Sequence, residues 1–101
     1  MKKYEGMRTI DGIVVTVDDT PLDERFDIAV FDDKGFEWSY EGSAPSQLAL
    51  AILADHLQDA EKARTTVETF VVTVIADLDN DWILTSSDID DALSKSTNIV
   101  E

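Results

Sequence analysis

The chain has no cysteine and only one histidine, two prolines and four glycines among its 101 residues. Without cysteine it can form neither disulfides nor thiolate metal sites, so the fold must rest on packing alone. The longest apolar run, residues 48–54, is far too short to span a bilayer. No signal-peptide pattern follows Met1 either. We therefore expect a cytoplasmic protein that does not bind membranes.

Positive charge is also scarce, with 8 Lys and Arg against 22 Asp and Glu and a formal net charge of −14. Nucleic acids and anionic membranes both require a basic binding face, so this balance argues against direct binding to either. The hydrophobic fraction of 44% is high enough for a folded core. We expect residues 1–95 to form a single acidic domain, followed by a frayed tail at residues 96–101.

Strand and turn signals occupy the first 40 residues. Residues 3–17 predict a hairpin, because residues 13–17 are β-branched and Asp11-Gly12 is a strong turn signal. Asp18-Asp19-Thr20-Pro21 is expected to end the second strand. A weaker strand pattern covers residues 28–31, and alternating aromatic residues at 36–40 predict a strand with one buried face.

Helical patterns dominate the remainder. Residues 42–47 read as a helix entry, with Ser43 or Ala44 near the cap, and residues 48–54 are apolar on almost all sides. This pattern predicts a buried central helix that ends near Leu57. Residues 60–76 carry one helical stripe of apolar positions, although the β-branched run 69–75 favours a strand. A short apolar piece then leads to a capping-box pattern at Thr85, predicting a helix over residues 86–94. The predicted fold is α+β, a small antiparallel sheet of three or four strands packed with about three helices.

One central motif resembles a known family. It reads Gly35-Phe36-Glu37-Trp38-Ser39-Tyr40, followed by Pro45-Ser46-Gln47-Leu48-Ala49-Leu50-Ala51. This pattern is similar to the core of a small prokaryotic and phage-associated family of unknown function. The likeness extends to Lys3-Tyr4-Glu5-Gly6 with Arg8, to Pro21-Leu22-Asp23, and to Trp82, Leu84-Thr85 and Ile89. It implies a shared fold over most of the chain and no known activity. Ser39, Glu41 and Ala44 stand where that family usually has glycine.

Few side chains could carry catalysis. The only histidine, His56, has no Ser or Cys near it in the sequence to serve as a nucleophile. The Gly-Ser turn at residues 42–43 opens a helix, but no Gly-Lys-Ser/Thr pattern follows, and Glu37 and Glu41 stand nearby. Phosphate binding is therefore disfavoured. We expect no enzyme activity, no catalytic residues and no cofactor site.

Residues 77–88 follow the outline of a calcium-binding loop, with aspartate at positions one, three, five and twelve. Trp82 stands at position six, where the sharp turn requires glycine, and Asp88 is shorter than the usual final glutamate. A solvated acidic loop before a capped helix is the better interpretation. No metal ligands are predicted, and a single-site calcium-binding protein remains an alternative.

The acidic residues form two blocks, residues 18–41 and residues 77–101. We call residues 18–41 the acidic segment. Its nine acids, against Arg25 and Lys34, are the candidate partner-binding residues: Asp18, Asp19, Asp23, Glu24, Asp27, Asp32, Asp33, Glu37 and Glu41.

The leading hypothesis is a non-catalytic module whose carboxylates mimic nucleic-acid phosphates. It would inhibit a basic DNA- or RNA-binding partner, as anti-restriction and anti-CRISPR proteins do. The alternative is an acidic domain from a halophilic cytoplasm, where 15 Asp, 7 Glu and 5 Lys would reflect habitat.

Overall fold

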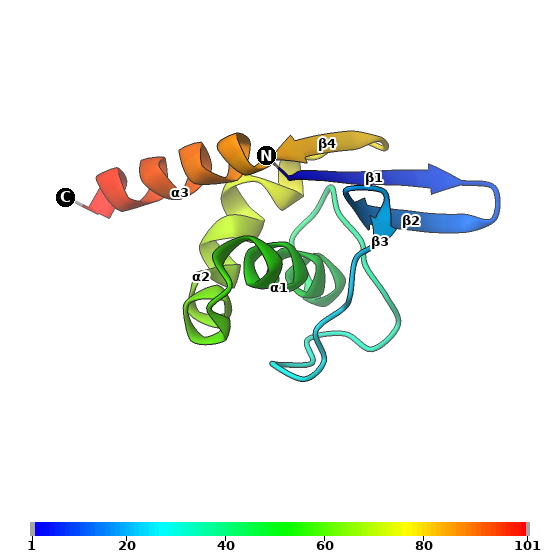
Figure 1. The fold of residues 1–101 in the computed structure, drawn as a ribbon, viewed down its shortest axis with the longest axis horizontal. Coiled ribbons are helices and arrows are strands. Elements are labelled where there is room, and N and C mark those ends of the chain that lie inside the picture. Colours follow the sequence, from blue (N-terminus) through cyan, green and yellow to red (C-terminus); the bar gives the residue numbers. More distant parts are fainter. Residues whose placement is uncertain (1, 101) are drawn as a thin grey trace.

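The computed structural model describes the backbone of residues 2–100 and the side chains of residues 2–94. In chain order it contains strands β1 (Lys3–Thr9), β2 (Gly12–Val17) and β3 (Thr20–Pro21), helices α1 (Ser43–Leu57) and α2 (Ala60–Thr73), the 3₁₀ helix η1 (Ile75–Asp77), strand β4 (Trp82–Thr85) and helix α3 (Ser86–Val100). The sheet is antiparallel throughout, in the order β3-β2-β1-β4. Helices α1 and α2 lie below it in Figure 1, and α3 runs away from the opposite end to the β1–β2 turn. The predicted α+β fold is confirmed.

The predicted hairpin at residues 3–17 is also confirmed. Thr9 pairs with Gly12 across a turn formed by Ile10 and Asp11, and Gly12 has a φ of 122°, a conformation that favours glycine. Asp18 and Asp19 then form a second tight turn, with φ values of 48° and 69°. Two consecutive positive φ values match the twist of a hairpin turn, so the chain reverses into β3 where the strand was expected simply to end.

The strands predicted at residues 28–31 and 36–40 are wrong. Trp38 is fully buried, whereas Phe36 is half-buried and Tyr40 is 49% exposed, so the aromatic side chains do not share one buried face. Ser39 has a φ of 77°, which no strand residue adopts. The backbone of Ser39 instead donates to the carbonyl of Ile75 at 3.1 Å, which holds this stretch against η1. The fourth strand is β4, at residues predicted only as an apolar lead-in to a helix.

Helix α1 is the buried centre of the molecule, as predicted. Every residue from Leu48 to Leu53 has no exposed surface. The sheet, α2 and the acidic segment enclose this helix from different sides (Figure 1). Tyr4 of β1, also fully buried, donates its hydroxyl to Asp55 near the end of α1 at 2.7 Å. Burial, followed by the neighbouring Asp55 carboxylate, raises the pKa of Tyr4.

Helix α2 confirms the predicted stripe, since Val67, Phe70 and Val71 are buried and the stripe continues through Ile75 in η1. The α-helix itself ends at Thr73, because Val74 departs from helical geometry with a φ of −128°. The β-branched residues that favoured a strand therefore lie in the last turns of a helix that changes to 3₁₀ form.

Helix α3 begins with the predicted capping box. The amide of Thr85 donates to the Asp88 carboxylate at 2.9 Å, and the amide of Asp88 donates to the Thr85 hydroxyl at 3.2 Å. The helix continues to Val100, beyond its predicted end at Ser94. The tail predicted at residues 96–101 falls outside the described side chains and stays a prediction. Across the described residues, no helix has both the length and the apolar character that crossing a membrane requires.

Candidate functional site

One buried side chain, Gln47 of α1, holds the middle of the acidic segment. Gln47 has no exposed surface, and its Oε1 accepts hydrogen bonds from the amides of Phe31 at 2.7 Å and Asp32 at 3.2 Å. Its Nε2 donates to the carbonyls of Glu24 at 2.7 Å and Ala29 at 3.1 Å. These four bonds use the full capacity of a side-chain amide. A segment without helix or long strand is thereby fixed against the central helix.

Trp38 provides the second attachment of the acidic segment. Its indole Nε1 donates to the carbonyl of Asp79 at 2.7 Å, and its ring meets that of Trp82 edge-on, with centroids 5.6 Å apart. The Arg8 guanidinium carbon lies 4.5 Å from the centre of the Trp38 ring. Arg8 also donates to Glu37 at 2.7 Å and to the carbonyl of Trp38 at 3.1 Å. The end of the segment is thus tied to β1 and to the loop before β4.

Several of the nine candidate acids stabilise the chain locally. Asp18 accepts from the amide of Lys3 at 2.9 Å, and Asp23 accepts from the amide of Arg25 at 2.7 Å. Asp27 makes two bonds to the Arg25 guanidinium, at 3.0 and 3.1 Å, which lower the pKa of Asp27. These carboxylates stabilise turns, so they already have hydrogen-bond partners within the molecule.

The side chains of Asp32 and Glu37 also have partners within the molecule. Asp32 accepts from the amide of Lys34 at 2.8 Å and from the hydroxyl of Ser43 at 2.9 Å, and these bonds lower its pKa. Glu37 pairs with Arg8 as described above. Within the described part of the chain, four candidates have neither a hydrogen bond nor an ion pair at their side chains: Asp19, Glu24, Asp33 and Glu41.

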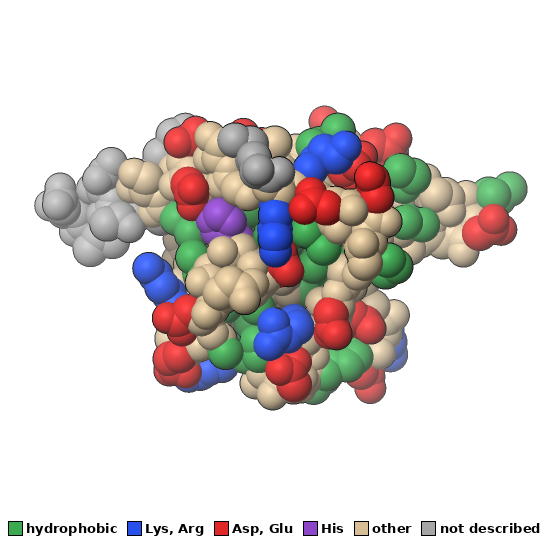
Figure 2. Space-filling model, viewed as in Figure 1, with side chains coloured by type: hydrophobic (Ala, Val, Ile, Leu, Met, Phe, Trp, Pro, Cys, Tyr) green, Lys and Arg blue, Asp and Glu red, His purple; other side chains and the backbone are tan. Residues whose placement is uncertain are grey.

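The nine acids are not gathered into one cluster. Asp18 lies beside Lys3, at the start of β1, whereas Glu37 lies beside Arg8, five residues further along that strand. Five residues of extended strand span about 17 Å. Asp32 and Glu41 lie near the N-terminus of α1 instead. On the face shown in Figure 2, acidic side chains are likewise spread over the sheet, the loop and the helices, separated by other surface.

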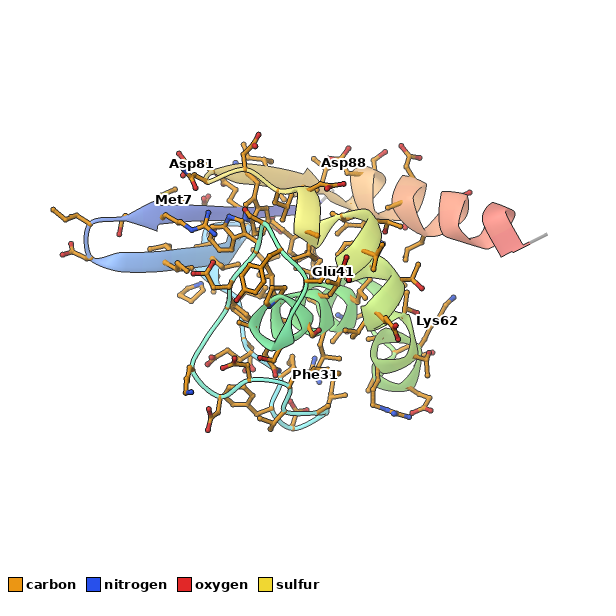
Figure 3. The ribbon with its side chains drawn as sticks, turned by 180° about the vertical axis from the view of Figure 1, so that it is seen from behind. Met7, Phe31, Glu41, Lys62, Asp81 and Asp88 are labelled. Atoms are coloured by element: carbon orange, nitrogen blue, oxygen red, sulfur yellow. The ribbon has the colours of Figure 1, made fainter. Side chains whose placement is uncertain are left out.

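A half-open hollow of about 380 Å³ lies beside the N-terminus of α1. We call it the α1 hollow; the acidic segment and α1 form one side of it, with Phe31, Glu41 and Ser46, and α2 forms the other, with Thr65, Glu68 and Val72. Phe31 is 40% exposed and Val72 is 50% exposed. Figure 3 shows Phe31 and Glu41 on this side of the molecule, away from Met7 on the hairpin. Sequence reasoning missed Val72, because this residue lies beside the buried stripe of α2 and not within it.

The calcium-type loop at residues 77–88 is divided among three elements. Asp77 ends η1, Trp82 is a buried residue of β4, and Asp88 takes part in the capping box. Within residues 2–94, no three His, Asp or Glu side chains lie together in a way that could hold a metal ion. His56 at the end of α1 lies 2.6 Å from Asp90 of α3, so its contact joins two helices.

The comparison with known families gives a match over most of the chain. A family model described as a family of unknown function, DUF6166, matches residues 4–95. The chain belongs to DUF6166. The predicted resemblance to a family of unknown function is confirmed, while its prokaryotic and phage association stays a prediction. Searches of curated proteins and of solved structures found no significant match.

In this member of DUF6166, several residues that carry the resemblance pack together, although they are distant in the sequence. Arg8 and Trp38 form one contact, and Trp82 lies against both Trp38 and Gly6. Gln47, within the same central motif, holds the acidic segment. The motif is therefore a set of attachments between the segment, the sheet and α1. Their convergence was not visible in the sequence, since residues 8, 38 and 82 meet only in the folded chain.

Proposed function

We propose that this protein is a non-catalytic binding module that occupies the nucleic-acid-binding surface of a basic protein. One observation carries the proposal. The acidic segment is held in a fixed shape by Gln47 and Trp38, yet four of its carboxylates, on Asp19, Glu24, Asp33 and Glu41, make no hydrogen bond or ion pair within the described residues. Surface charges with no internal partner are available to an external one.

The physical argument rests on preorganisation. A flexible acidic tail must lose conformational entropy when it binds, whereas a fixed segment has lost that entropy during folding. Complementary charge also speeds the encounter with a basic surface and disfavours acidic competitors. The four carboxylates without a hydrogen bond or ion pair would take the place of phosphates, which are the main contacts of nucleic-acid-binding proteins. Restriction and CRISPR nucleases are the partner class that fits this chemistry.

The test begins with the protein immobilised in a lysate of its native host, and each captured partner is then purified. Duplex DNA and single-stranded RNA are titrated against the purified complex at 0.05 M and 0.2 M salt. The proposal expects nucleic acid to displace the protein from its partner, and expects the isolated protein to bind neither nucleic acid. A partner that binds without any such competition would overturn it.

A halophilic origin is the second candidate account, favoured by the excess of Asp over Glu and the scarcity of Lys. In this account the acidic residues keep the protein soluble in strong salt and do not recognise a partner. The overall acidity of the source proteome separates the two accounts. If habitat causes the acidity, the proteins encoded by neighbouring genes should be acidic as well. If the protein mimics nucleic acid, those proteins should have ordinary net charges.

A further inference from the structure

The α1 hollow combines exposed apolar surface with carboxylates that lack a hydrogen bond or ion pair in the described part of the chain. Val67 and Val71 are each only 4% exposed, whereas Phe31 and Val72 present 40% and 50% of their surfaces to solvent. Glu41 and Glu68, which also line the hollow, make no hydrogen bond or ion pair within residues 2–94. A side chain with an apolar stem and a cationic head would satisfy both features.

Among the residues with described side chains, the one cation lining the hollow, Arg64, is already engaged. Arg64 donates to both carboxylate oxygens of Glu61, at 2.8 and 2.9 Å, so its charge is matched outside the hollow. The N-terminus of α1 contributes a positive dipole equivalent to about half an elementary charge. The two negative charges of Glu41 and Glu68 together exceed this partial positive charge at the helix N-terminus. The hollow therefore remains negative overall and favours a cation over an anion.

We propose that the α1 hollow receives an arginine side chain of the basic partner. The stem would lie against Phe31 and Val72, and the guanidinium would meet Glu41 and Glu68. Arginine fits better than lysine because its planar head can bond carboxylates with two parallel hydrogen bonds and is less strongly hydrated. A second copy of this chain is a poor occupant, since each copy carries a net charge of −14. The volume of about 380 Å³ lies at the small end of the range for ligand pockets, about 300–1,000 Å³.

This inference rests on the proposed function for the identity of the partner, but the hollow can be tested alone. The isotope-labelled chain is titrated with n-butylguanidinium, and its amide resonances are followed by NMR. Guanidinium tests the head without the stem, and n-butylurea tests the same shape without charge. We expect n-butylguanidinium to give saturable shifts at Phe31, Ser46 and Val72, with at least about threefold weaker binding for either control compound.

A double variant, Glu41→Gln with Glu68→Gln, should weaken n-butylguanidinium binding by about threefold or more. The matched control, Asp79→Asn with Asp81→Asn, removes the same charge at residues that do not line the hollow and should leave the affinity nearly unchanged. Equal binding of n-butylurea would instead indicate an apolar occupant, and concentration-dependent broadening at Val72 would indicate a second copy. Either result, or shifts spread evenly over the acidic surface, would overturn the proposal.

The two proposals can fail separately. If n-butylguanidinium binds in the hollow but nucleic acid never competes with a captured partner, the proposed function fails and the arginine site stands. If nucleic acid competes but the Glu41→Gln, Glu68→Gln variant binds that partner as tightly as the parent, only the arginine site fails.

Discussion

At the scale of single residues, Gln47 is the buried polar side chain of the described core, and its position explains the shape of the acidic segment. Its four partners are backbone groups between residues 24 and 32. No periodicity in the sequence could reveal this role, since the partners lie 15 to 23 residues away and carry no distinctive side chain. The apolar residues around Gln47, in contrast, were predicted from their pattern alone.

Replacing Gln47 by leucine should destabilise the protein by about 2–5 kcal/mol, because two amides and two carbonyls lose their partner. The change keeps a side chain of similar size, so the loss reports hydrogen bonding more than packing. Denaturant melts measure the free energy of unfolding, and hydrogen exchange should accelerate at Phe31 and Asp32 more than in β1. Unchanged exchange at these two amides would show that the segment is held by other contacts.

Gly6 is needed for a different reason, the closeness of Trp82. A Cβ atom added at Gly6 would lie 2.3 Å from the Trp82 ring, which is itself held against Trp38. Gly6→Ala should therefore cost about 1–3 kcal/mol through overpacking. In a Trp82→Leu background, where the ring is gone, the same change should cost much less. An equal cost in both backgrounds would place the effect in the backbone of β1.

At the scale of elements, local signals predicted the structure well wherever neighbours in sequence make the contacts. The β1–β2 hairpin and the start of α3 both follow from turn and capping residues a few positions apart. The strand predicted at residues 36–40 was wrong because Trp38 is buried by β1, η1 and Trp82, which are distant in sequence. The backbone conformation of the residues next to Trp38 is then set by these distant contacts and not by the local alternation of side chains. β4 is short and pairs with β1, so its strand character also depends on a distant partner.

The capping box offers a test at this scale. Thr85→Ala and Asp88→Ala should each cost about 0.5–2 kcal/mol, because each removes one bond to an otherwise unpaired amide of the first turn. Together they should cost less than the sum, since the two bonds depend on one geometry. Ser87→Ala, at an exposed position between them, is the control and should be nearly neutral. If the stability losses of the two single variants add up to that of the double variant in thermal or denaturant melts, the two hydrogen bonds of the capping box are independent and this prediction is wrong.

Across the molecule, most Lys and Arg side chains of residues 2–94 are already paired with a carboxylate. Lys2, Lys3, Arg8, Arg25 and Arg64 each lie within 4.0 Å of a carboxylate. The excess of negative charge is consequently left without compensation over the surface. The total charge and its two blocks are visible in the sequence, but which carboxylates stabilise turns and which are available is not. That division depends on hydrogen bonds formed only after folding.

Monovalent salt should stabilise this protein, because uncompensated carboxylates repel one another more in the compact state than in the unfolded chain. Raising the ionic strength from about 0.01 M to 0.15 M shortens the screening length from roughly 30 Å to 8 Å, and the unfolding midpoint should rise. A continued strong gain above about 1 M, where screening already acts within roughly 3 Å, would favour the halophilic account. A midpoint that falls between 0.01 M and 0.15 M would contradict the repulsion argument.

Two variants of equal net charge, compared in binding to the captured partner, test whether the acidic segment is the binding surface. One neutralises the four uncommitted acids of the acidic segment, by Asp19→Asn, Glu24→Gln, Asp33→Asn and Glu41→Gln. The other neutralises four acids outside it, by Asp77→Asn, Asp79→Asn, Asp81→Asn and Asp91→Asn. The first should raise the dissociation constant at least about tenfold, equivalent to about 1.4 kcal/mol, and should flatten its salt dependence, while the second should change it by less than about threefold. Equal weakening in both variants, or none in either, would contradict the claim that the acidic segment is the binding surface.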